Sequence, residues 1–156
     1  MGMSSSANII FGFCLGAAEE IEGPWHDGRI DDWYLKIRGF APEFEIYDAR
    51  GNYLPGIEDN RQKIDEWYRL RREWIEANPE FFDLYYAGHC DYSSYYFGLK
   101  KPSYSGSSYD DTEIDPSTLV VSEEDREALI AFAKEHFSAL EGNWDQPKWY
   151  LITHWG

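Results

Sequence analysis

The sequence predicts an α+β fold, a single-domain sandwich. We expect a mixed or mainly antiparallel sheet of about five or six strands with two to three helices on one face. Residues 81–101 contain two aromatic-rich runs around a short polar break, which is the pattern of a β-hairpin. Residues 59–77 place apolar side chains at helical spacing. Strand-like and helix-like segments also alternate along the chain, which favours helices packed on a sheet.

Composition supports one folded domain over residues 1–156. The chain is 43% hydrophobic and 18% aromatic, which argues against disorder. Its 29 acidic and 14 basic side chains give a net charge of -15. Direct binding of nucleic acid or of an anionic membrane needs clustered Lys and Arg, so we expect neither. A basic protein partner fits this charge better.

The two cysteines, Cys14 and Cys90, lie far apart and form no CxxC pair. We interpret them as buried free thiols in a reducing cytoplasm. The apolar residues around Cys14 are too few to span a bilayer. A leader peptide usually has Lys or Arg before its apolar stretch, and none precedes these residues. The sequence therefore predicts a cytoplasmic protein without membrane association.

The first half of the chain yields three elements before the hairpin. Residues 8–15 form an apolar run typical of a buried strand, in which Gly12 and Gly16 allow close approach of another backbone. Residues 30–37 show helical spacing and end before Gly39. Residues 44–54 are expected to form two short strands around a turn.

Two further helices have recognisable ends. Asp59 or Asn60 can cap the helix over 59–77, which Asn78-Pro79 terminates. Ser122 can cap a later helix, with Asp125 completing a capping box, and that helix is expected to continue to about Gly142.

The remaining segments are a long loop and a final strand. Residues 102–118 are rich in Ser, Tyr and Asp and show no periodicity, so we expect a long acidic loop. Residues 148–155, KWYLITHW, are typical of a strand that completes the sheet.

The acidic side chains concentrate in this loop and its surroundings, since residues 102–147 carry 11 acidic and 2 basic residues. The acids after Ser122 are explained by the helix start, whereas those in the loop are not. We interpret the loop as a binding surface in which carboxylates steer a basic partner and tyrosines anchor it. The alternative is that these acids are only solvated surface. The residues assigned to the surface are Tyr104, Tyr109, Asp110, Asp111, Glu113 and Asp115.

No metal or cofactor is predicted. The stretch DDTEIDPST clusters carboxylates, but it lacks the ligand spacing and the turn glycine of a calcium-binding loop.

The tyrosines of the hairpin suggest a second function. Tyr86 and Tyr96 are candidates for an exposed sheet face that stacks a base or another flat ligand. A small-ligand or nucleotide-sequestering protein is therefore the first alternative to a protein-binding role.

An enzymatic role is the second alternative. A small hydrolase-like centre could use Cys90 or a carboxylate pair such as Asp31 and Asp32. His89 is a poor base for Cys90, because adjacent residues on a strand point to opposite faces. The Walker A, GxGxxG, HExxH and GxSxG motifs are all absent from the sequence. Enzymatic activity is therefore the less favoured hypothesis.

The end of the chain, PKWYLITHWG, resembles that of small acidic proteins encoded by phages and prophages. In those proteins, as here, an acidic Asp-Pro loop and a Glu-rich helix precede a Trp-containing last strand. The resemblance covers about the last third of the chain and implies an accessory protein, often an inhibitor of a host enzyme or defence complex. Our leading hypothesis is thus a non-enzymatic acidic binding protein, a phage-type inhibitor that mimics nucleic acid and docks a basic groove of a host protein.

Overall fold

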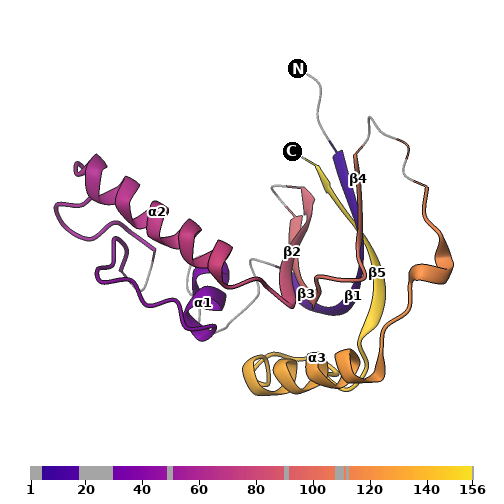
Figure 1. Cartoon of the computed structure of the whole chain (residues 1–156). Coiled ribbons are helices and arrows are strands. Elements are labelled where there is room, and N and C mark those ends of the chain that lie inside the picture. Colours follow the sequence, from indigo (N-terminus) through magenta and orange to yellow (C-terminus); the bar gives the residue numbers. More distant parts are fainter. Residues whose placement is uncertain are drawn as a thin grey trace. The chain divides into compact units, whose positions relative to one another are not determined.

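A computed structural model describes residues 5–17, 30–48, 51–89, 92–107, 111 and 113–155 (Figure 1). The chain separates into two compact units, which we describe one at a time. The sheet unit comprises Met1–Ile21 and Phe81–Gly156, and the helical unit comprises Glu22–Glu80. The predicted α+β class is confirmed, since the described residues form a five-stranded mixed sheet and three α-helices. The prediction of one domain over residues 1–156 remains a prediction.

The sheet has the strand order β3-β2-β5-β1-β4, and β3 also pairs with β1. All pairings are antiparallel except that of β2 with β5. The first part of β1 pairs with β4 and β5, and its last part pairs with β3. Because β3 also pairs with β2, and β2 with β5, these pairings form a closed ring and the sheet curls on itself. The strands are β1 Ser5–Ala17, β2 Phe82–His89, β3 Tyr92–Leu99, β4 Tyr104–Ser107 and β5 Lys148–Trp155.

Gly12 marks the point on β1 where the pairing partner changes. It pairs with Gly98 on β3, and a Cβ atom on Gly12 would lie 2.0 Å from the carbonyl oxygen of Phe97. Only glycine permits this approach of two backbones. The close contact expected at Gly12 is therefore confirmed.

One face of the sheet packs against α3, which spans Glu123–His136. Phe97 on β3 is fully buried and lies between Phe132 and Phe137, with ring centroids 4.9 and 5.0 Å away. Phe13, which pairs with Phe97 across β1 and β3, adds an edge contact to Trp144. These aromatic contacts fix α3 over one part of this face.

The opposite face of the sheet holds a smaller core. Ile10, Ala87 and Ile152 are buried there, and three partly buried tyrosines pack around them. These are Tyr85, Tyr96 and Tyr150. Much of the tyrosine surface of the hairpin is therefore used in packing.

The helical unit contains α1 (Ile30–Ile37) and α2 (Arg61–Ala77), and their predicted positions are confirmed. The side chain of Asn60 accepts a hydrogen bond from the Lys63 amide and caps α2. Trp67 of α2 is the largest buried side chain of a core that also includes Leu35, Phe40, Ile46 and Ile57. The two strands predicted over 44–54 are reduced to one isolated bridge between Tyr47 and Tyr53.

The hairpin and the final strand agree with the sequence prediction, but the segment between them differs. Residues 102–118 were expected to form a loop, yet they include β4 and a short 3-10 helix, η1 (Pro116–Thr118). Helix α3 begins after Ser122 as predicted, and it ends at His136 rather than near Gly142. In Figure 1 the chain leaves β4 and runs through η1 before it enters α3.

Candidate functional site

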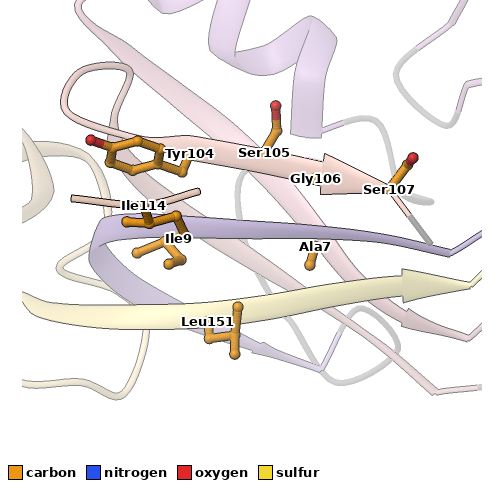
Figure 2. Close-up of a pocket in the computed structure, with 8 residues that line it drawn as sticks. All are labelled: Ala7, Ile9, Tyr104, Ser105, Gly106, Ser107, Ile114 and Leu151. Carbon is orange, nitrogen blue, oxygen red and sulfur yellow. The ribbon is translucent and has the colours of Figure 1, made fainter. Parts of the chain in front are cut away.

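The sheet unit has a hollow beside β4 with a volume of about 170 Å³, which we call the β4 hollow (Figure 2). Three neighbouring strands and one separate segment contribute to its wall. Its lining residues are Ala7, Ile9, Tyr104, Ser105, Gly106, Ser107, Ile114 and Leu151. Apart from the Tyr104 and serine hydroxyls, these side chains are apolar, so the hollow suits an aliphatic or aromatic group.

Strand register brings the apolar residues of the hollow to one face. Ile9 on β1 lies opposite Tyr104 of β4 on one side and opposite Leu151 of β5 on the other. Directly opposite residues in an antiparallel sheet share a face, and residues two apart along a strand do so as well. Ile9 therefore shares a face with Phe13, the residue that packs towards α3. The β4 hollow lies on the same face, nearer the start of β1.

This part of the face remains open. Leu151 is 71% exposed, and Trp149, two residues earlier on β5, is 37% exposed. A protein surface contains many scattered apolar residues, but here they adjoin a hollow with an apolar wall. The arrangement is that of a docking surface rather than of a finished core.

Ile114 reaches the hollow because the chain after it is held by local hydrogen bonds. The Asp115 side chain accepts hydrogen bonds from the Ser117 amide and hydroxyl and so caps η1. These two bonds lower the pKa of Asp115. The Tyr104 and Thr118 hydroxyls are also hydrogen-bonded, which ties η1 to the start of β4. Figure 2 shows Ile114 on its separate stretch of chain beside Ile9.

The predicted binding surface remains a prediction, and the structure places one of its residues, Tyr104, at the hollow. Tyr104 lines the hollow, and Glu113 and Asp115 flank Ile114 in the sequence, with Asp111 just before them. Asp111, Glu113 and Asp115 are all exposed. Sequence analysis found no local reason for an acid at position 115, whereas in the structure Asp115 caps η1. Tyr109 and Asp110 lie outside the described residues.

The predicted ligand face is not brought together. Tyr96 lies opposite Tyr85, and Tyr86 lies opposite Tyr95, so the alternation of strands places Tyr86 and Tyr96 on different faces. Tyr86 is 36% exposed and contacts the rings of Tyr95 and His154. The two residues therefore do not form one stacking platform.

Tyr96 packs with Cys14 and Tyr150 on the face that holds the smaller core. Partial burial, then the neighbouring Cys14 and Tyr150, raise the pKa of Tyr96. Cys14 itself is exposed, so the prediction that it is a buried thiol is wrong. The reason is alternation along β1: Phe13 and Leu15 point into the core, and Cys14 between them points the other way.

The enzymatic alternatives gain little from the geometry. Cys90 and the side chain of His89 lie outside the described part of the chain. Within that part, no group of three or more His, Cys, Asp or Glu residues could hold a metal ion. No described helix is both long and apolar enough to cross a membrane.

The carboxylate pair Asp31 and Asp32 belongs to an ion-pair cluster in the helical unit. Asp32 lies 3.5 Å from Arg71. Partial burial raises the pKa of Asp31, and the nearby charges of Arg71 and Glu80 act in opposite directions on it. Structural ion-pair networks also shift pKa values, so the raised pKa of Asp31 does not by itself mark a catalytic centre.

Arg38 follows α1 and joins it to the end of α2. It forms an ion pair with Glu80 at 2.6 Å and donates to the carbonyl oxygen of Asn78, also at 2.6 Å. Its guanidinium lies over the Tyr34 and Trp74 rings. An arginine that donates to a C-terminal helix carbonyl and stacks on aromatic rings serves the fold, so we assign this cluster to stability.

Sequence reasoning missed the apolar half of the site. Ile9 was assigned to a strand buried on both faces, and Leu151 to an ordinary final strand. The position of Leu151 opposite Ile9 follows from the register of β1, β4 and β5. Ile114 was the available signal, because it is an isolated aliphatic residue between two acids in a polar segment.

No protein-family model, curated protein or solved structure matches this chain. The likeness of its C-terminal third to small phage proteins therefore remains a prediction.

Proposed function

We propose that this protein is a non-enzymatic binding protein that docks a cationic surface of a partner protein through the β4 hollow. The observation that carries the proposal is the open apolar wall formed by Ile9 and Leu151, which Ile114 joins from a segment whose preceding residues Asp111 and Glu113 are exposed. A partner with an apolar side chain flanked by Lys or Arg is complementary to both features.

The two parts of the site contribute differently to binding. Complete burial of a leucine side chain is worth about 1.5–3 kcal/mol, so covering Leu151 can supply a substantial share of the affinity. Exposed carboxylates contribute less affinity but accelerate the encounter with a basic surface, and salt screens this effect. Affinity should therefore depend on the hollow and the association rate on the acids.

The size of the hollow favours a side chain over a free nucleotide. Its volume is about 170 Å³. Sites for drug-sized molecules usually occupy about 300–1,000 Å³, whereas an apolar cavity of about 150 Å³ accepts a single benzene ring. One large apolar side chain of a partner is thus the better fit.

The net charge of the whole chain indicates the class of partner. A net charge of -15 repels nucleic acid and attracts basic surfaces over a distance that salt limits. A partner whose basic groove otherwise binds nucleic acid would meet a competitor here. An inhibitor that acts by nucleic-acid mimicry, as phage accessory proteins often do, fits this description.

The test uses a short synthetic peptide of alternating Lys and Val as a probe. The double variant Asp111→Asn/Glu113→Gln neutralises the two acids that precede Ile114 in the sequence. The control Glu124→Gln/Glu127→Gln removes the same charge from exposed positions of α3. We expect Asp111→Asn/Glu113→Gln to slow association with the peptide more than Glu124→Gln/Glu127→Gln does. It should also weaken the salt dependence of the association rate more than the control variant does. Equal effects of the two variants would mean that only net charge matters, which contradicts docking at the hollow.

A further inference from the structure

The outer edge of β4 adjoins the hollow and has the character of an available sheet edge. β4 is the last strand in the sheet order and pairs with β1 along one side. None of the other described strands pairs with its second side. Proteins commonly protect such an edge with Lys, Pro or a bulge, but the sequence of β4 is Tyr-Ser-Gly-Ser and its pairing with β1 is regular.

The small residues beside this edge leave a path into the hollow. Gly106 of β4 lies opposite Ala7 of β1, so the only side chain of this pair is the methyl group of Ala7. Adjacent strands lie about 4.8 Å apart. A long apolar side chain on a strand added next to β4 could therefore extend over Gly106 towards Ala7 and Leu151, which line the hollow.

We propose that the partner segment binds in an extended conformation as an additional strand beside β4. Its backbone hydrogen-bonds to the outer edge of β4 at either Ser105 or Gly106, because adjacent residues of a strand turn their amide and carbonyl groups to opposite edges. One apolar side chain of the segment enters the β4 hollow. This inference rests on the proposed function and adds to it the conformation of the ligand, an extended segment in which apolar residues alternate with Lys or Arg. Such strand addition gains affinity from the main chain and specificity from alternate side chains.

The charge of the neighbourhood selects this occupant over a second copy of the chain. Glu113 and Asp111 are exposed and precede Ile114, which lines the hollow, by one and three residues, and the whole chain carries a charge of -15. Two copies joined edge to edge at β4 would bring these acids together, which costs energy, whereas a cationic strand neutralises them. A cationic segment is therefore the complementary ligand.

Backbone methylation of the Lys-Val peptide provides the test. Two isomers are compared with the parent, one N-methylated at every Lys and the other at every Val, so that each loses the amide donors of one edge only. A bound strand turns one edge to β4, so we expect about a tenfold or greater loss of affinity for one isomer and near-parent affinity for the other. The parent peptide should also slow hydrogen exchange at the Ser105 or Gly106 amide.

The possible outcomes separate this inference from the proposed function. If both isomers bind like the parent, or both lose affinity alike, the strand geometry is wrong. The proposed function survives that result when Asp111→Asn/Glu113→Gln still slows association of the parent peptide. Absence of binding by the parent overturns both. A dimer of the chain alone that protects the β4 amides would also overturn strand addition by a partner.

Discussion

Ile9 of β1 and Leu151 of β5 lie directly opposite each other in the antiparallel ladder, and both line the β4 hollow. Despite this position within the sheet, Leu151 is 71% exposed. Because α3 covers another part of the same face, the pair forms an apolar surface that a partner can cover.

Replacement of Asp115 by alanine should loosen the segment that carries Ile114. The change removes the acceptor for the Ser117 amide and hydroxyl, so the Ser117 amide should exchange faster with solvent. Asparagine retains a capping oxygen, so Asp115→Asn should have a smaller effect. If Ser117 exchanges equally fast in the unmodified protein and in Asp115→Ala, the cap does not hold the segment.

The pH dependence of this cap has a definite sign. The folded-state pKa of Asp115 is lowered from its usual 3.8 by the bonds from Ser117. Its contribution to stability is therefore present above pH 3.8 and is lost as the pH falls through the folded-state pKa. An NMR titration of the Asp115 carboxyl should give a midpoint below that of an ordinary aspartate.

Cys14 should react with a thiol reagent in the folded protein, because its side chain is exposed. The Cys90→Ser variant isolates this reaction. We expect folded Cys90→Ser to be labelled completely on the timescale of the unfolded chain, and the double variant with Cys14→Ser to remain unlabelled. Strong protection of Cys14 in the folded state would contradict its exposed position.

Tyr96 should make the protein sensitive to alkaline pH. Its pKa is raised in the folded state, mainly by partial burial. The associated stability is complete below the usual value of 10 and is lost as the pH rises through the folded-state pKa, because the unfolded chain releases the proton first. Unfolding measured on both sides of pH 10 should show a smaller alkaline loss in Tyr96→Phe than in the unmodified protein.

Trp67 should tolerate phenylalanine far better than alanine. Its indole N–H is buried and has no hydrogen-bond partner among the described residues, and a buried unpaired donor costs about 1–3 kcal/mol. Trp67→Phe removes this cost but leaves a smaller ring, so the two effects oppose each other. Trp67→Ala loses the contacts to Phe40, Tyr47 and Tyr68, and should cost about 3–5 kcal/mol in denaturant unfolding. If Trp67→Phe lowers the free energy of unfolding as much as Trp67→Ala does, this expectation is wrong.

Local sequence patterns were sufficient to predict most elements of the fold. The final strand over 148–155 and the helix over 30–37 match their predicted bounds because apolar spacing and terminating residues agree there. The prediction over 102–118 failed because three of the four residues of β4 are serine or glycine, which have little strand propensity and here pair with β1. Such a strand depends on tertiary contacts that local propensity does not report.

The candidate site was only partly predictable for the same reason. Tyr104 and the acids near it stood out by composition, whereas the apolar wall required the register of three strands far apart in the sequence. A shift of one residue in that register would turn Ile9 and Leu151 to the other face. Their convergence is thus a property of the pairing and not of any segment alone.

The central claim, docking of a cationic segment at the β4 hollow, is tested most directly by comparing Leu151→Asp with Val120→Asp. Leu151 and Val120 are 71% and 69% exposed, so neither substitution should greatly affect folding, but only Leu151 lines the hollow. The measurement is the affinity of each variant for the Lys-Val peptide by calorimetric titration. We predict that Leu151→Asp weakens binding about tenfold or more while Val120→Asp leaves it close to that of the unmodified protein. Equal affinities of the two variants would contradict docking at the hollow.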